Sequence, residues 1–141
     1  MTEPPIVYEQ STTASVDTVW QAMTDINLLP NWFFKEISQF QPEPGFESRF
    51  TVHFAGVDYE HVMTVKEVMP QAKLTVGWRY EGIPGDTELV WEVIGNDAGS
   101  TIRFSHYGTE TFPQDNEAFT REAGQAGWDY FSNSLKQFVE G

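Results

Sequence analysis

Between residues 46 and 106, apolar side chains recur at every second position in one segment after another. In a β-strand, every second side chain lies on the same face. Each segment with this two-residue repeat therefore predicts a strand with one buried and one exposed face. Turn-forming sequences separate the segments, as at Gly82-Ile83-Pro84-Gly85 and Asn96-Asp97-Ala98-Gly99. The pattern therefore predicts a meander of antiparallel strands, because short turns join strands that run in opposite directions.

One long helix is predicted after the last strand, over about residues 116 to 139. Its apolar stripe has members spaced by four, three, four and three residues, which places them on one face. They are Gly124, Trp128, Phe131, Leu135 and Phe138. A twisted sheet would wrap its apolar face around this helix. Glycines at 124 and 127 weaken a helix interior, so they predict either close packing on the sheet or free volume beneath the helix.

The N-terminal part is predicted to contribute a strand over residues 5 to 13 and a short helix that Ser15 caps. A second short helical piece is predicted over about residues 25 to 34, interrupted by Pro30. The expected order is strand, two short helices, five or six strands and one long helix. At 141 residues, the chain is expected to form a single domain, residues 1 to 141.

The composition excludes several classes of function. Twenty-one acidic residues against eight basic ones give a net charge of −13, which opposes binding to nucleic acid or anionic membranes. The chain has no cysteine, so it forms no disulfide and no thiolate metal site. It shows neither a run of 18 apolar residues nor a signal-peptide pattern, and a cytoplasmic protein is expected.

Short motifs along nearly the whole chain occur in an order seen in one protein superfamily. They include Val16-Asp17-Thr18-Val19-Trp20-Gln21-Ala22-Met23-Thr24-Asp25, Trp32-Phe33, Pro44-Gly45-Phe46, Val65-Lys66-Glu67-Val68-Met69-Pro70, Trp78-Arg79, Glu88-Leu89-Val90-Trp91-Glu92, His106 and Gly127-Trp128. In these motifs the chain resembles the START-like (SRPBCC) superfamily. It is most similar to the branch of homologues of an activator of a heat-shock-protein ATPase.

The resemblance implies an α+β helix-grip fold. A curved antiparallel sheet would wrap around a long C-terminal helix, with two short helices closing one end and a cavity between sheet and helix. Members of this superfamily bind lipids, sterols, polyketides and plant hormones, and some are cyclases or dehydratases. They share no universal catalytic residue, so the resemblance supports a cavity for a small hydrophobic or aromatic molecule better than it supports a reaction.

Side chains predicted on the inner faces are the candidates for lining this cavity. The set comprises Trp32, Phe34, Phe54, His61, Met63, Trp78, Trp91, Phe104, His106, Gly124, Trp128 and Phe131. For any single aromatic residue, packing in the core is the simpler interpretation. Taken together, 21 aromatic residues exceed what a core of this size needs, and aromatic side chains commonly line apolar pockets. At least one of the three adjacent aromatic residues at 32–34 is expected at the cavity mouth.

His106 is in phase with Ile102 and Phe104, so its imidazole is expected to face the cavity. Two interpretations stay open: a polar anchor or acid–base group near neutral pH, or a histidine hydrogen-bonded to a neighbour, which is favoured. His61 shares a face with Tyr59 and could join it. No catalytic residue and no cofactor are assigned, and a metal site is not expected because the histidines do not cluster.

Two functions from different classes follow. The first is a binding protein that encloses a small, largely apolar molecule, with a cyclase-like or dehydratase-like enzyme as a variant using the same cavity. The second, which the resemblance suggests, is a protein that binds a heat-shock chaperone and stimulates its ATPase. A homodimer would be unsurprising if an aromatic residue is exposed at the cavity mouth. The acidic excess favours a neutral or cationic ligand.

Overall fold

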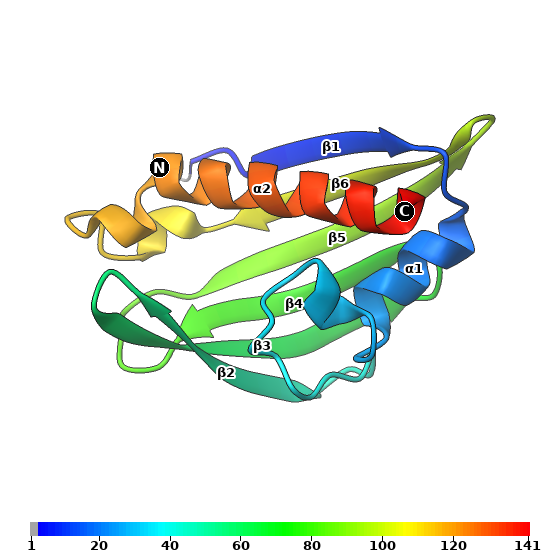
Figure 1. Ribbon diagram of the computed structural model, residues 1–141. Coiled ribbons are helices and arrows are strands. Elements are labelled where there is room, and N and C mark those ends of the chain that lie inside the picture. The colour runs from blue at the N-terminus through cyan, green and yellow to red at the C-terminus, as the bar shows by residue number, and fades with distance from the viewer. Residues whose placement is uncertain (1–2) are drawn as a thin grey trace.

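A six-stranded antiparallel sheet curves around one long helix in the computed structural model, which describes residues 3–141 (Figure 1). The strands are β1 (Ile6–Thr12), β2 (Glu47–Phe54), β3 (Val57–Met69), β4 (Lys73–Tyr80), β5 (Thr87–Asn96) and β6 (Gly99–Tyr107). Their order is β1-β6-β5-β4-β3-β2, so hairpins join β2 through β6, and β1 pairs with β6. This architecture confirms the predicted helix-grip fold.

The helices are α1 (Val16–Thr24) and α2 (Arg121–Glu140), with short 3-10 helices η1 (Leu29–Asn31), η2 (Thr109–Thr111) and η3 (Glu117–Phe119). Ser15 caps α1, because its hydroxyl accepts a hydrogen bond from the Thr18 backbone N–H at 3.2 Å. In the part of the chain that the structure describes, no helix has the length and apolar character needed to span a membrane.

Two helix predictions need correction. The helical piece expected over residues 25 to 34 shrinks to the single turn η1, where Pro30 lacks the N–H that a longer helix would need. The long helix begins at Arg121 rather than near residue 116. Thr120 is its N-cap and accepts a hydrogen bond from the Ala123 backbone N–H at 3.2 Å, while the residues before it form η3.

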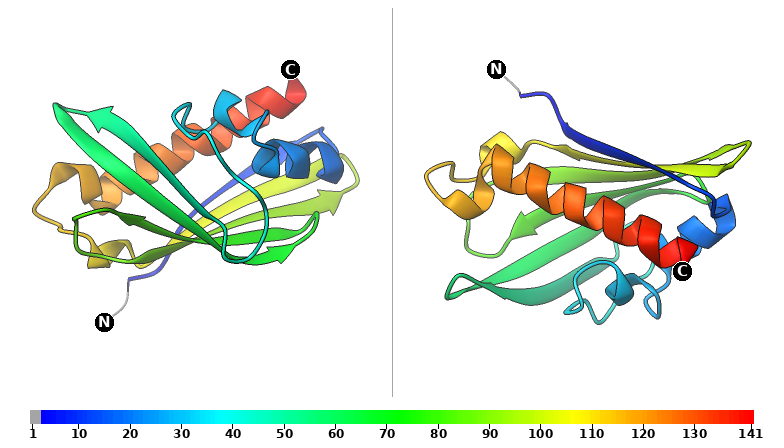
Figure 2. Two further views of the ribbon diagram at one scale, coloured as in Figure 1. Left: turned by 90° about the horizontal axis from the view of Figure 1, so that it is seen from below. Right: turned by 45° about the horizontal axis from the view of Figure 1, so that its top comes forward.

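α1 and the segment after it close one end of the sheet, beside the C-terminal half of α2 (Figure 2). The Trp32 indole donates a hydrogen bond to the Ala22 carbonyl at 2.7 Å, which fixes this segment against α1. The Trp32 ring stacks on Phe104 at 5.8 Å, and Trp91 lies 5.3 Å from Phe104. This aromatic core leaves the other end of the sheet, beneath the N-terminal half of α2, less filled.

Candidate functional site

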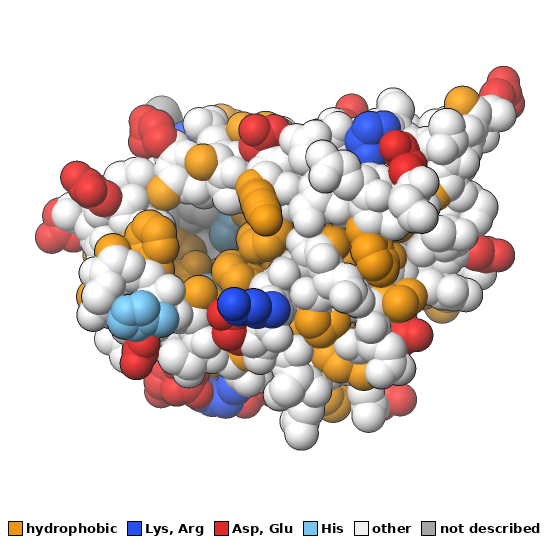
Figure 3. Space-filling view, viewed as in Figure 1, with side chains coloured by type: hydrophobic (Ala, Val, Ile, Leu, Met, Phe, Trp, Pro, Cys, Tyr) orange, Lys and Arg blue, Asp and Glu red, His pale blue; other side chains and the backbone are white. Residues whose placement is uncertain are grey.

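Two adjoining cavities lie between the N-terminal half of α2 and the sheet, and they open as a hollow flanked mostly by hydrophobic side chains, with a basic side chain and a histidine beside it (Figure 3). The inner cavity, of about 170 Å³, is lined by Phe34, Trp78, Tyr80, His106, Thr109, Phe112, Ala118, Phe119, Thr120, Ala123, Gly124, Gly127, Trp128 and Phe131. The outer cavity, of about 480 Å³, is lined by Phe34, Val52, Phe54, Ala55, Tyr59, His61, Tyr80, Glu117, Ala118, Phe119 and Ala123. Because five lining residues are shared, the two cavities form one cleft.

The predicted site residues separate into two groups in the structure. Eight of them line the cleft: Phe34, Phe54, His61, Trp78, His106, Gly124, Trp128 and Phe131. The other four, Trp32, Met63, Trp91 and Phe104, line neither cavity and are no more than 2% exposed. These four belong to the aromatic and aliphatic core beside α1, because the segment around η1 fills that half of the space beneath α2.

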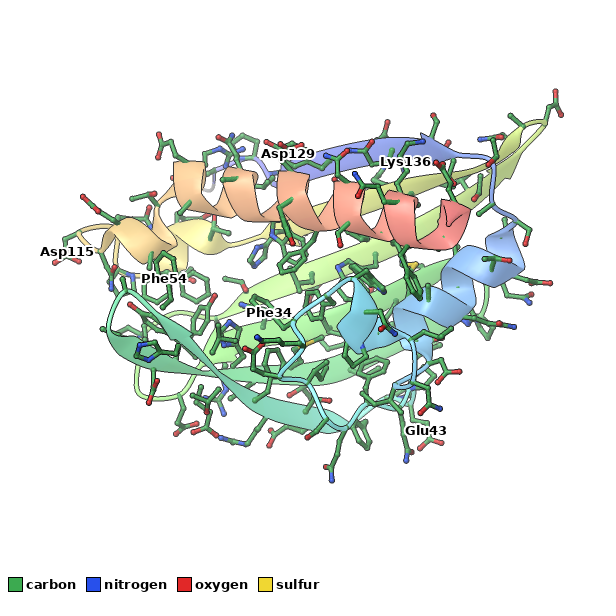
Figure 4. All side chains as sticks on the ribbon, in the orientation of Figure 1. Phe34, Glu43, Phe54, Asp115, Asp129 and Lys136 are labelled. Carbon is green, nitrogen blue, oxygen red and sulfur yellow. The ribbon has the colours of Figure 1, made fainter. Side chains whose placement is uncertain are left out.

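Phe34 lines both cavities and Phe54 lines only the outer one (Figure 4). Of the three adjacent aromatic residues at 32–34, the first two are buried, whereas Phe34 is half-buried and packs on His61 at 5.0 Å and on Phe131 at 4.8 Å. Phe54 is 57% exposed at the end of β2. A left-handed turn follows it, with φ of 53° at Ala55 and 81° at Gly56, which closes the β2–β3 hairpin tightly.

His106 is hydrogen-bonded through both ring nitrogens. Its Nδ1 accepts a hydrogen bond from the Trp128 indole N–H at 3.0 Å, and its Nε2 lies 2.8 Å from the Thr87 hydroxyl. The Thr87 hydroxyl donates its hydrogen to the Trp78 carbonyl at 2.7 Å. The Nε2 atom of His106 must therefore carry a proton and donate it to the Thr87 oxygen. Burial lowers the pKa of His106 to about 3. The residue is therefore a neutral histidine in the cavity wall that presents ring carbon atoms, with no nitrogen free for a ligand.

His61 differs from His106 because only one of its nitrogens is engaged. Its Nδ1 lies 3.0 Å from the Tyr59 carbonyl, which can only accept, so Nδ1 carries the proton and Nε2 has a free lone pair. Burial lowers the pKa of His61 to about 4, although the hydrogen bond to Tyr59 partly opposes this effect. At neutral pH the side chain is thus an uncharged hydrogen-bond acceptor in the wall of the outer cavity.

Tyr80 is the main polar lining residue that the sequence prediction omitted. Burial raises the pKa of its hydroxyl to about 12, so it remains protonated. The Trp78 side chain lies near the Tyr80 hydroxyl and offsets part of this rise in pKa. The buried Trp78 indole N–H nevertheless has no acceptor within hydrogen-bond geometry. Tyr80 continues the alternation of Leu74, Val76 and Trp78, which gave a signal for its inward direction.

Other omitted lining residues come from the segment between β6 and α2. The rings of Phe112 and Phe119 are tilted against the Tyr80 ring, with centroids 5.2 and 4.9 Å away. Irregular segments carry no periodicity, so their inward direction was not predictable from spacing. Among the described residues, Glu117 alone supplies a charged side chain to either cavity, and it is exposed at the rim. The described part of the chain also contains no cluster of three or more side chains suited to holding a metal ion.

The two helix glycines have different surroundings. A Cβ atom placed on Gly124 would come within 2.8 Å of the Ile6 side chain, so this glycine allows α2 to approach β1. A Cβ atom on Gly127 would meet nothing within 4 Å, and Gly127 lines the inner cavity. Of the two explanations that the sequence left open, close packing therefore applies to Gly124 and free volume to Gly127.

Replacing Gly127 with alanine is expected to raise the free energy of unfolding by about 1 kcal/mol, because alanine favours the helix and its methyl group enters empty space. Gly124→Ala is the matched control. There the same gain in helix propensity is offset by contact with the buried Ile6 side chain. Urea denaturation of both variants measures the difference. Equal stabilisation by the two substitutions would contradict the distinct surroundings described above.

Comparisons with known proteins agree with this fold. The Activator of Hsp90 ATPase homolog 1-like protein family matches residues 13–140. Protein CV1439 from Chromobacterium violaceum has a TM-score of 0.81 and 18% identity, with 98% of each chain covered. CalU16 from Micromonospora echinospora has a TM-score of 0.70 and 27% identity, with 96% of this chain and 75% of that chain covered. No curated protein matches the chain.

A further similar structure is DynU16, a protein of the dynemicin biosynthetic locus. It has a TM-score of 0.77 and 22% identity over 98% of this chain, which spans 48% of the DynU16 chain. The family match covers all but the first 12 residues and the last one, and it includes α1, α2 and every strand except β1. On this evidence, the chain belongs to the Activator of Hsp90 ATPase homolog 1-like family.

Proposed function

We propose that this protein binds a small, uncharged, largely aromatic molecule in the cleft beneath α2. The observation that carries the proposal is the cleft itself, a cavity of about 170 Å³ that continues into one of about 480 Å³. Aromatic rings from the sheet, from α2, from the segment before β2 and from the segment after β6 surround it. Concave, mostly apolar sites with a few polar groups are typical of small-molecule binding.

The electrostatics favour an uncharged ligand. Among the described residues, those that line the two cavities include no lysine or arginine to pair with an anion, and Glu117 places a carboxylate at the rim. The net charge of −13 adds a general repulsion of anions. Burial of a charged ligand without a partner would also carry a large desolvation cost.

One protein of similar fold comes from a biosynthetic locus, a setting that suits a small-molecule ligand. DynU16 is named for a biosynthetic locus, and its fold resembles that of this chain. An enzyme that uses His106 as an acid or a base has less support, because both of its ring nitrogens are already hydrogen-bonded. Binding without turnover is therefore the function proposed first.

Native mass spectrometry of the purified protein tests the proposal, since a ligand retained from the expression host appears as a mass above that of the denatured chain. Titration with a panel of fatty acids, sterols, flavonoids and polyketide-like aromatic compounds follows, with tryptophan fluorescence as the signal. Gly127→Leu is expected to weaken uptake while the protein stays folded, because its side chain enters the inner cavity. No retained mass and no saturable quenching by any compound would contradict the proposal.

A second candidate is stimulation of a heat-shock chaperone ATPase, which only the family description favours. It needs a surface that contacts the chaperone rather than a cavity. The test adds the purified protein to a heat-shock ATPase and measures ATP hydrolysis. An unchanged rate, together with no complex in size-exclusion chromatography, would remove this candidate and leave the ligand-binding proposal untouched.

A further inference from the structure

Three polar side chains face the outer cavity from neighbouring strands. Tyr59 and His61 lie two residues apart on β3, so they share a face, and His61 is directly opposite Tyr80 on β4. The His61 ring lies 4.7 Å from the Tyr80 ring, and the two tyrosine rings are 6.1 Å apart. All three residues line the outer cavity, and Tyr80 also lines the inner one.

The hydrogen-bonding capacity of this trio is largely unused within the protein. His61 is only 5% exposed, yet its Nε2 has no partner because Nδ1 makes the bond to the Tyr59 carbonyl. The Tyr59 hydroxyl has no hydrogen-bond partner among the described residues, and the Tyr80 hydroxyl lies near the Trp78 indole N–H, which does not reach it in hydrogen-bond geometry. None of these three atoms is among the fully buried atoms without a partner in the described residues, which are Trp78 Nε1 and Trp91 Nε1, so water or a ligand can reach them from the cavity.

The three groups define a pattern of donors and acceptors. The fixed tautomer of His61 makes its Nε2 an acceptor, whereas each tyrosine hydroxyl can donate or accept. A group that satisfies all three must offer one O–H hydrogen and an oxygen that accepts from the tyrosines. A hydroxyl group does so, while a ketone or an ether lacks the hydrogen that His61 requires.

We propose that Tyr59, His61 and Tyr80 form a hydroxyl-recognition subsite for a flat, uncharged aromatic ligand, with the phenolic O–H of the ligand donating to His61 Nε2 and its oxygen accepting from the tyrosines. The subsite rests on the proposed function, because it specifies the ligand of the same cleft. The aromatic part of the ligand lies against rings such as Phe34 and Phe119, which line both cavities. A carboxylate is excluded, because it has no hydrogen to donate and would lie near Glu117 without a cation.

Nuclear magnetic resonance titration of the ¹⁵N-labelled protein tests the subsite with three probes of one shape: 2-naphthol, 2-methoxynaphthalene and 2-methylnaphthalene. The five tryptophan indole N–H groups give separate signals, and those of Trp78 and Trp128 report on the inner cavity. We expect all three probes to shift these two signals. The dissociation constant of 2-naphthol should be lower by roughly tenfold than those of the other two, which cannot donate to His61.

Conservative variants test whether the two tyrosine hydroxyls cause the tighter binding of 2-naphthol. Tyr59→Phe and Tyr80→Phe keep the rings and should weaken 2-naphthol binding by about five- to tenfold each, with no change for 2-methylnaphthalene. Tyr130→Phe is the matched control, because Tyr130 is 62% exposed on α2 and lines neither cavity. Its binding constants should equal those of the unmodified protein.

The possible failures are distinguishable. Equal affinity for 2-naphthol and 2-methylnaphthalene, or tyrosine variants that bind 2-naphthol as the unmodified protein does, would overturn the subsite and leave the apolar cleft as a binding site. If no probe shifts the Trp78 and Trp128 signals or the backbone amide signals of Tyr59, His61 and Tyr80, the proposed function and the subsite both fail for aromatic ligands of this size.

Discussion

Lowering the pH from 7 to 5 is expected to reduce the free energy of unfolding by about 4 kcal/mol through two histidines. Burial lowers the pKa of His106 to about 3 and that of His61 to about 4 in the folded protein, against an ordinary value of 6.5. Between those values, the unfolded chain binds protons that the folded chain does not. The stability that the two neutral histidines contribute is thus fully present above pH 6.5. It falls as the pH drops toward 4, by up to about 1.4 kcal/mol per pH unit for each histidine.

Urea denaturation at half-unit steps between pH 7 and pH 5 measures this slope. His106→Gln should remove about half of the pH dependence, even if the substitution also changes the stability at pH 7. His61→Gln should remove the other half and provides an independent check. His53→Gln is the matched control, because His53 is exposed and pairs with Asp58 on the surface. A stability that stays flat between pH 7 and pH 5 would show that the two buried histidines accept protons without unfolding.

Trp128→Ala is expected to cost about 3 to 5 kcal/mol of folding free energy, since it empties a large buried site. The Trp128 ring is only 6% exposed and lies within 6.2 Å of the rings of Phe104 and Trp78. Its N–H is also the hydrogen-bond partner of His106 Nδ1. Thermal unfolding should show a midpoint lower by roughly 10 to 20 °C.

The Trp128→Phe variant separates packing from hydrogen bonding. It keeps most of the ring contacts but leaves His106 Nδ1 without a donor, which should cost about 1 to 3 kcal/mol. Because Nδ1 then no longer faces an N–H group, protonation of His106 becomes easier and the loss of stability below pH 6.5 becomes shallower. If Trp128→Phe and Trp128→Ala destabilise the protein equally, the hydrogen bond rather than the ring would be the main contribution.

The sheet could be predicted closely from the sequence, because alternation and turn residues are local signals. The Asn96-Asp97-Ala98-Gly99 turn predicted the end of one strand and the start of the next, and β5 and β6 meet there. The same alternation fixed the inward direction of His61 and Trp78. The inward direction of Tyr80 was also predictable, since Tyr80 follows Trp78 by two residues at the end of β4.

The division of the inner face into core and cleft could not be predicted in this way. Trp91 and Trp78 show the same alternation on neighbouring strands, yet the first is enclosed by Trp32 and Phe33 while the second lines the inner cavity. Alternation identifies the face of a side chain but not what covers it. The cover depends on how the segment around η1 folds over the sheet, and that segment has no regular period.

The start of the long helix was predicted about five residues too early for a similar reason. Asn116 and Thr120 are both good capping residues, and each caps a turn in the structure: Asn116 accepts from the Ala118 N–H at 2.9 Å and Thr120 accepts from the Ala123 N–H at 3.2 Å. Between them, η3 turns Phe119 toward Tyr59 and Tyr80. The sequence offered two starting points, and tertiary packing of Phe119 selects the later one.

Because the densely packed half of the molecule and the open half lie at opposite ends of α2, ligand preference and folding stability can be altered separately. The aromatic core around Trp32 and Trp91 holds the fold, while many of the positions that line the cleft lie on the β2–β3 hairpin, on β4 and on the N-terminal part of α2. A mutant library confined to lining positions such as Val52, Ala118 and Ala123 should therefore keep most of its members folded while varying which molecules they accept. Such a chain is a suitable starting scaffold for directed evolution of new binding specificities.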